Sequence, residues 1–333
     1  MKTKVVLAAG FLFAALGARG QEFLRLFPDD ERLLFLGPTE LQDTFLPSQL
    51  RYQSYPETAV VLPKGDWRVN VTVDWTADLA LTDTYLFDGE TITSTLRVRN
   101  SPFKNWEFGF DVPYTARIDG VADEFIEFVE TTLDAKVDAR YALPRDTYNS
   151  YIAGPNGTAL TFKKSEAFQD MTLRAKYQVL THDEHWVDMA AVGTFSLPSG
   201  GRTFGGHGVS PGIGLHIQKP FKYINFFTGA AGNYYTDTRE QFFSFNDWRG
   251  MAYGGAEIKP FWWTAAVFTY QMYTPFASSN YPLDQNAHYY SVMGRFWLGK
   301  RVTFEAGVVE NVGLIENRNS SDVTFKFSLT GHF

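Results

Sequence analysis

The feature that most constrains the fold is a strict alternation of apolar and polar residues from Trp67 to Trp75, in the sequence WRVNVTVDW. A period of two residues is typical of a β-strand that has one apolar and one polar face. A Trp stands at each end of the apolar face, about 26 Å apart at ~3.3 Å per residue, which fits the two aromatic girdles of a membrane barrel. We predict that one face contacts lipid and the other faces the interior, with Trp67, Val69, Val71, Val73 and Trp75 on the first and Asn70, Thr72 and Asp74 on the second.

Similar patterns recur along the chain and predict twelve strands. They lie near 67–76, 89–99, 105–115, 169–180, 186–197, 208–218, 222–235, 250–259, 262–273, 287–298, 301–311 and 321–333. Short connections alternate with much longer ones, as expected for periplasmic turns and external loops. A soluble β-sandwich shows the same side-chain alternation but has no reason to alternate its loop lengths. The sequence therefore predicts an all-β, transmembrane, antiparallel up-and-down barrel of about twelve strands with one long extracellular loop carrying a short helix.

Composition agrees with this class. The chain has 30 Phe, 17 Tyr and 8 Trp and no Cys, and a chain without cysteine suits an oxidising periplasm. The formal net charge is −7, which argues against nucleic-acid binding.

The start of the chain predicts export. Lys2 and Lys4 form a positive region, Val5 to Gly17 is apolar and uncharged, and Ala18-Arg19-Gly20 supplies small residues for cleavage. This is the order of a secretory signal peptide, so we expect residues 1–20 to be removed. The apolar run falls short of the ~20 residues of a membrane-spanning helix, which makes a retained anchor the weaker interpretation.

The end of the chain has a second signature. Val323, Phe325, Phe327, Leu329 and Phe333 share one face of an alternating stretch. A final strand with a terminal aromatic residue resembles the last strand of bacterial outer-membrane proteins. This resemblance implies that the barrel assembly machinery reads Phe333 as an assembly signal in a Gram-negative bacterium. It also implies periplasmic chaperones and outer-membrane lipids as partners.

Several longer stretches resemble the family of predicted outer-membrane barrels catalogued as domain of unknown function 3187. They are LPKGDW (62–67), DGET (88–91), RIDGVADEFIEFVETTL (117–133), SLPSG (196–200) and the closing SSDVTFKFSLTGHF. In addition, RYQSYP looks like a degenerate form of the Arg-Asn-Gln-x-Pro start of that family. The resemblance implies a barrel in the cell outer membrane and no established activity or catalytic residue.

Residues 21–65 differ from the barrel that we expect over 66–333. They contain Pro38, Pro47, Pro56 and Pro63 and no clean alternation. We expect either a periplasmic extension or a segment inside the lumen.

Charged residues on the polar faces of the strands are the candidate functional residues. They are Arg97, Arg99, Glu107, Asp111, Arg174, Lys176, Asp188, Glu257, Arg295, Glu305 and Lys326. Such mixed charges either line an aqueous path and set its selectivity or pair across strands and fill the barrel.

The sequence names no catalytic residue, metal ligand or cofactor site. GGRTFGGHG (200–208) lacks a following helix that would hold a phosphate. His207 and Ser210, and also His288 and Ser291, are three residues apart, so on a strand each pair points to opposite faces. His182 and His185 flank a short turn, where solvated side chains are the simpler interpretation. A Ser-His pair between strands stays open.

The long loop from Thr115 to Ala167 contains apolar residues at helical spacing, namely Val121, Phe125, Phe128, Val129 and Leu133, with acidic residues among them. We expect a short amphipathic helix that gates the barrel mouth. The alternatives are a helix on the outer membrane surface and a helix packed on neighbouring loops.

Together these observations favour a porin-like channel or transporter for small solutes or lipophilic molecules. The alternatives are an outer-leaflet lipid-modifying hydrolase and a structural or adhesion barrel. A Ser-His pair would favour the hydrolase, a wide lumen the pore, and a packed lumen the structural barrel.

Overall fold

The computed structural model describes residues 35–83, 85–120, 123–132, 147–153, 159–201, 204–205, 208–237, 239–240, 243–278, 283–299, 301–311 and 323–333. The predicted signal peptide, residues 1–20, therefore lies outside the described residues.

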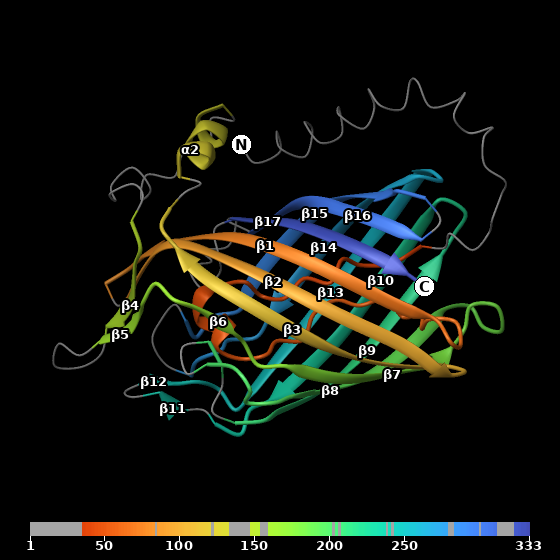
Figure 1. Ribbon diagram of the computed structural model, residues 1–333, viewed down its shortest axis with the longest axis horizontal. Helices are drawn as coiled ribbons and strands as arrows, with labels where there is room; N and C mark the ends of the chain where they lie inside the picture. The colour runs from red at the N-terminus through yellow and green to blue at the C-terminus, as the bar shows by residue number, and fades with distance from the viewer. Residues whose placement is uncertain are drawn as a thin grey trace.

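Twelve long strands form a closed antiparallel barrel, as the sequence predicts (Figure 1). The first strand closes the barrel by pairing with the last, for example Val71 opposite Leu329. The strands are β1 (Trp67–Leu81), β2 (Tyr85–Phe103), β3 (Trp106–Ile118), β7 (Thr172–Leu180), β8 (Asp188–Ser196), β9 (Ser210–Pro220), β10 (Ile224–Tyr234), β13 (Trp248–Phe261), β14 (Thr264–Tyr273), β15 (Ala287–Trp297), β16 (Val302–Asn311) and β17 (Val323–His332).

The alternation of residue types decides which face of each strand is outside. Val71 on β1 is 46% exposed, whereas its neighbour Thr72 is 1% exposed. The same alternation surrounds the barrel with exposed apolar residues, including Leu215, Phe226 and Phe268. A continuous apolar outer face around a closed sheet is what a barrel in lipid requires, because every strand edge is paired.

The two ends of the barrel differ. At the end near the C-terminus the connections are short, such as residues 104–105 between β2 and β3 and 262–263 between β13 and β14. We call this the periplasmic end and the opposite one the outer end. The connection from β1 to β2 at the outer end, residues 82–84, is shorter than expected because both strands extend beyond their predicted limits.

Five short strands lie at the outer end or beside it. They are β4 (Asn149–Ala153), β5 (Ala159–Phe162), β6 (Glu166–Phe168), β11 (Arg239–Glu240) and β12 (Phe243–Ser244). The extended part of β2 pairs with β4, which pairs with β5, so the barrel wall continues outward there. Three of them, β6, β11 and β12, are too short for a period of two residues to reveal them in the sequence.

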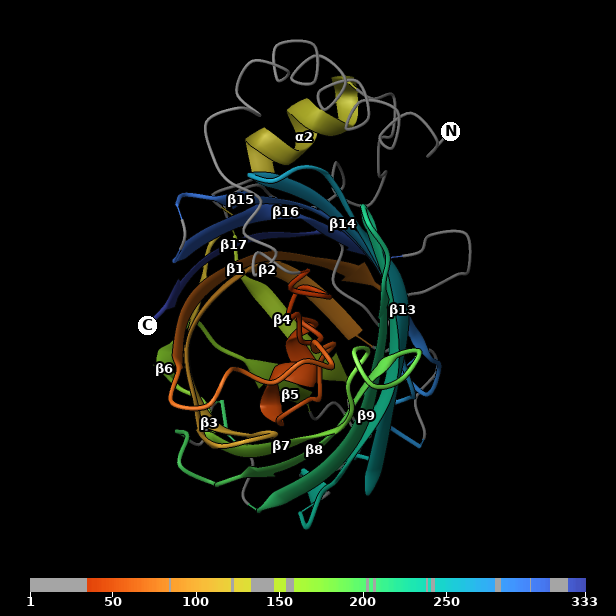
Figure 2. The ribbon, with the colours of Figure 1, turned by 90° about the vertical axis from the view of Figure 1, so that its right-hand side faces the viewer.

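Residues 35–66 lie inside the ring of strands, which Figure 2 shows in red and orange when the barrel is viewed from the periplasmic end. Their one regular element is the 3₁₀-helix η2 (Leu46–Leu50), which has Pro47 in its first turn. We call residues 35–66 the plug. Of the two placements expected for residues 21–65, the plug occupies the lumenal one, while residues 21–34 lie outside the described residues.

One helix, α2 (Asp123–Thr132), follows β3 at the outer end. Its Ile126 is buried in one cluster with Ala77, and Trp75, Val323 and Phe325 pack against this cluster. Because Trp75 and Phe325 belong to the outward faces of β1 and β17, this contact is with the outer wall. It favours the alternative in which the helix lies outside the barrel. Trp75, predicted to contact lipid, lies partly beneath this cluster.

The contacts of the predicted gate residues are not described. Val121 and Leu133 lie outside the described residues, and the side chains of Phe125, Phe128 and Val129 are not described. The gating role thus stays a prediction. No helix in the described ranges is long and apolar enough to cross a membrane.

Candidate functional site

The eleven charged residues predicted on the polar faces are all buried on the inner face of the barrel, each less than one-tenth exposed. The structure brings most of them into contact with one another or with the plug. Of the two expected arrangements, pairing across strands is present, and a separate segment supplies further partners. The aqueous path stays a prediction. Asp188 lies apart at the periplasmic end, where Oδ1 accepts hydrogen bonds from Gln178 and from the backbone of His182.

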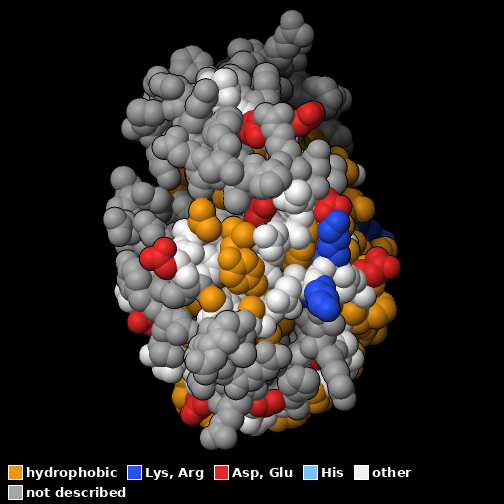
Figure 3. All heavy atoms as spheres, turned by 90° about the vertical axis from the view of Figure 1, so that its left-hand side faces the viewer, with side chains coloured by type: hydrophobic (Ala, Val, Ile, Leu, Met, Phe, Trp, Pro, Cys, Tyr) orange, Lys and Arg blue, Asp and Glu red, His pale blue; other side chains and the backbone are white. Residues whose placement is uncertain are grey.

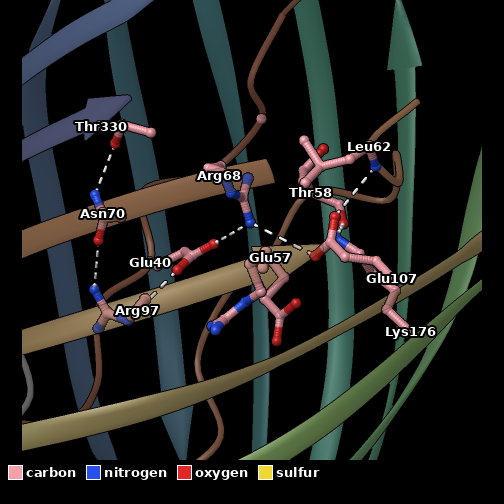
Figure 4. Close-up of polar contacts among 12 residues, drawn as sticks. Glu40, Glu57, Thr58, Leu62, Arg68, Asn70, Arg97, Glu107, Lys176 and Thr330 are labelled. Carbon is pink, nitrogen blue, oxygen red and sulfur yellow. Dashed lines mark hydrogen bonds and ion pairs between the residues drawn. The ribbon is translucent and has the colours of Figure 1, made fainter. Parts of the chain in front are cut away.

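A first network joins Glu40 of the plug to the wall (Figure 4). Arg68 Nη2 lies 3.1 Å from Glu40 Oε1 and 3.7 Å from Glu107 Oε1, so it bridges the two carboxylates. Arg97 Nε lies 3.5 Å from Glu40 Oε2. On its other side Glu107 pairs with Lys176 at 3.1 Å. Burial alone raises the pKa of Glu40, but the charges of Arg68, Arg99 and Arg97 outweigh it and hold this pKa well below its usual range.

A second network surrounds Tyr55 and Glu57 of the plug. Tyr55 Oη donates a hydrogen bond of 2.7 Å to Asp111 Oδ2 and accepts one of 2.9 Å from Arg99. Arg174 donates to both Tyr55 Oη and Glu57. The cation of Arg97 also lies over the Tyr55 ring, 5.1 Å from its centroid. The plug is therefore fastened to the wall by ionic, hydrogen-bonding and cation–π contacts at one level.

The plug backbone is bound by long polar side chains of the wall. Lys176 Nζ donates to the carbonyl oxygen of Val60 at 3.2 Å, and Glu107 Oε2 accepts from the backbone N–H of Leu62 at 3.2 Å. Gln218 Oε1 accepts from the backbone N–H of Ala59. Because the plug is not paired as a strand here, these contacts satisfy backbone groups that would otherwise be buried without partners.

The remaining predicted charges form two further groups. Arg295 binds Glu257 at 2.6 Å and Glu305 at 2.5 Å, and Glu257 accepts from the backbone N–H of Gly37 at 2.8 Å. Lys326 pairs with Asp74 at 2.8 Å.

Sequence reasoning missed the plug residues, Arg68 and Arg249. Arg249 pairs with Asp43 of the plug at 2.6 Å. The sequence does contain a signal for Arg249, because it lies eight positions before Glu257 and an even spacing on a strand places both on the same face. The predicted strand begins at residue 250, however, and so excludes Arg249. The partners on the plug have no comparable signal, since residues 21–65 show no periodicity.

The outer end of the lumen is apolar. Phe45 and Leu46 of the plug are buried in a cluster with residues of β1, β2, β4 and β5 and of the outer connections. The ring of Phe45 lies 5.1 Å from that of Phe87 and 6.0 Å from that of Phe276. A view from this end also shows hydrophobic side chains near the centre of the described surface (Figure 3). The plug therefore has an apolar outer part and an ionic inner part.

Two small cavities lie between plug and wall within the described ranges. One of about 30 Å³ lies beside Asp43, Ser48 and Gln169, and one of about 40 Å³ lies beside Glu40, Arg295 and Lys326. Each has room for a few water molecules at ~10–15 Å³ per water.

The two Ser-His pairs spaced by three residues and the other inward-facing or turn histidines have the following placements. His288 lies on the outward face of β15 and contacts the Tyr270 hydroxyl at 2.6 Å, whereas Ser291 is buried on the inward face. His207 lies outside the described residues. His182 contacts Asp188 at 3.0 Å in the turn between β7 and β8. His216, absent from the predicted set, faces inward and contacts the Tyr253 hydroxyl at 2.8 Å. No group of three potential metal ligands occurs in the part of the chain that the structure describes.

The closed twelve-stranded sheet with an apolar outer face and a charged, plugged interior defines an outer-membrane β-barrel. The chain belongs to the family described as "Protein of unknown function (DUF3187)", whose model matches residues 27–333. This confirms the family resemblance seen in the sequence.

Solved structures are similar to this chain. The COG4313 outer membrane channel from Pseudomonas putida F1 is similar over 84% of this chain and 100% of its own, with 10% identity and a TM-score of 0.59. The NanC porin is similar over 79% of this chain and 98% of its own, with 8% identity and a TM-score of 0.48. A search of curated proteins found no match. The fold places the protein in the outer membrane, as the sequence predicts.

Proposed function

We propose that the protein is a gated outer-membrane passage for small solutes or lipophilic molecules, and that the plug closes it. The observation that carries this proposal is the way the lumen is filled. The charged inner wall is matched by one continuous segment of chain, which enters from residues 63–66 at the periplasmic end. A barrel whose interior is filled by the side chains of its own wall needs no such segment.

The chemistry of the contact supports a plug that can move. A buried ion pair stabilises no more than a well-packed apolar pair of similar volume, because both charges lose their hydration. When water enters the lumen, Glu40, Glu57 and their arginine partners regain that hydration. Separation of these charges in a wet lumen therefore costs less than exposure of an equally large apolar contact. The similar fold of a protein named as an outer membrane channel agrees with this function.

A structural barrel is the second candidate, favoured by the small cavities within the described lumen.

The two functions predict different currents when the plug is loosened. Phe45 is fully buried at the apolar outer end of the plug, so Phe45→Ala removes much of its packing there. Phe268→Ala is a matched control. It removes the same aromatic ring, but from the lipid-facing side of β14 and not from the plug.

Single-channel recording of the refolded proteins in planar bilayers tests the proposal. A gated passage predicts a larger open fraction or conductance for Phe45→Ala than for the wild type, with Phe268→Ala unchanged. Folding is checked by heat-modifiable gel migration. Correctly folded protein without current in all three samples would support the structural barrel and contradict the passage.

A further inference from the structure

A strip of positive charge runs over four adjacent strands of the inner wall. It consists of Arg68 on β1, Arg97 and Arg99 on β2, and Arg174 and Lys176 on β7, with β3 between β2 and β7. We call these five residues the basic strip. All of them face the plug, and four are less than one-tenth exposed, Arg68 being only slightly more so.

The wall itself does not neutralise the basic strip. On the same strands β3 contributes Glu107, which pairs with Lys176, and Asp111, which pairs with Arg99 at 2.6 Å. The other partners come from the plug: Glu40 binds Arg68 and approaches Arg97, while Glu57 binds Arg174. With the plug displaced, the five cations keep only Glu107 and Asp111 as ion-pair partners on these strands, because the inward-facing Asp74 of β1 pairs with Lys326.

The strip also has donor capacity that the plug leaves unused. The Nε atoms of Arg99 and Arg174 are buried and make no hydrogen bond with any described residue. A guanidinium binds a carboxylate best through two parallel N–H donors, and such charge-assisted bonds are strengthened where water is scarce. The single carboxylates of Glu40 and Glu57 therefore leave some N–H donors of the basic strip without an acceptor.

From this geometry we infer that the basic strip is a binding site for a solute bearing carboxylate groups, and that Glu40 and Glu57 occupy this site when the plug is in place. The inference rests on the proposed passage function and names its substrate class. The solute competes with the plug for the same arginines, so its binding favours the displaced plug. A ligand that binds only the displaced state shifts the equilibrium toward that state, and the shift grows with ligand concentration above its Kd.

Citrate, which carries three carboxylates, serves as the probe. Titration calorimetry on detergent-solubilised, folded protein compares the wild type with the double variant Glu40→Gln/Glu57→Gln, in which the plug no longer offers negative charge. Citrate should bind the variant at least about tenfold more tightly than the wild type, since two competing carboxylates are removed. Inorganic phosphate should bind more weakly than citrate, and a neutral sugar should not bind.

The control for lost charge is Asp183→Asn/Glu184→Gln, which removes two exposed carboxylates from the turn between β7 and β8. It should bind citrate as the wild type does. In the Glu40→Gln/Glu57→Gln background, the further changes Arg97→Gln and Arg174→Gln should abolish the gain. Equal citrate affinity in wild type and double variant, or tighter binding of phosphate than of citrate, would overturn the assignment.

Bilayer recordings of the same proteins separate the two proposals. The double variant should pass anions in preference to cations and be blocked by citrate. A current that prefers cations and is insensitive to citrate would refute the anion site and leave the passage standing. Citrate binding without any current would keep the site and refute the passage.

Discussion

Arg249 on β13 and Asp43 on the plug form an ion pair with 2.6 Å between Nη2 and Oδ2, and both side chains are almost fully buried. The second oxygen of Asp43 accepts a hydrogen bond of 2.6 Å from the Tyr289 hydroxyl. The two charged residues are more than two hundred positions apart in the chain, so the contact fixes the plug to a distant part of the wall.

Removal of Asp43 alone should destabilise the folded protein much more than replacement of both Asp43 and Arg249 by apolar residues. Asp43→Ala leaves the Arg249 charge buried without its partner, which should lower the free energy of unfolding by about 3–5 kcal/mol. The double variant Asp43→Leu/Arg249→Met should lose clearly less. Unfolding equilibria in lipid vesicles measure both. Lys164→Ala, which breaks an exposed pair with Asp119, is the control and should change stability by less than about 1 kcal/mol. A cost that small for Asp43→Ala would contradict the buried contact.

The position of the barrel in the membrane can be tested on β1. Val71 is exposed at the middle of the outward face, and Trp67 lies at its periplasmic end. Val71→Arg should destabilise the folded protein by ~2–4 kcal/mol, whereas Trp67→Arg should cost ~0–1 kcal/mol because it lies near the interface. Refolding equilibria in vesicles compare the two. Equal penalties would mean that the strand sits at another depth.

The contact of α2 with the outer wall leads to a third prediction. Replacement of Asp123–Thr132 by a Gly-Ser linker removes Ile126 from its contact beside Trp75 on the outer wall. Single-channel conductance and ion preference should therefore stay as in the wild type. An increase in conductance would instead support the gate at the mouth that the sequence suggests.

The barrel strands were predictable because the pattern that specifies each strand lies in neighbouring residues of the sequence. An alternation of residue types such as that from Trp67 to Trp75 specifies both the strand and its lipid-facing side. Lumen-facing charges such as Arg97 and Glu257 follow from the same alternation. Arg249 lies one residue before the predicted strand, which begins at residue 250, whereas β13 begins at Trp248. Strand boundaries are the least reliable part of what periodicity predicts.

The plug was not predictable in the same way. Its position depends on contacts between residues far apart in the chain, such as Thr44 with Thr324 and Ser54 with Asn233. Residues 21–65 have no period that indicates which side chain meets the wall. The placement of α2 has a similar cause: the apolar spacing predicts a helix, but an apolar stripe fits the mouth and the outer wall equally well.

The most direct test of gating by the plug locks the plug to the wall. Thr44 Oγ1 and Thr324 Oγ1 lie 2.8 Å apart, and the chain has no native cysteine. Thr44→Cys/Thr324→Cys should therefore form a disulfide between plug and β17. The matched control is Thr76→Cys/Thr324→Cys, which joins neighbouring wall strands whose hydroxyls are 2.9 Å apart and leaves the plug free.

The decisive measurement is the single-channel current of the oxidised Thr44→Cys/Thr324→Cys protein before and after a reductant is added to the same bilayer. If the plug gates the barrel, the oxidised protein stays closed, the current appears on reduction, and the control pair conducts in both states. An oxidised plug-linked protein that conducts as well as the reduced one would contradict gating by the plug.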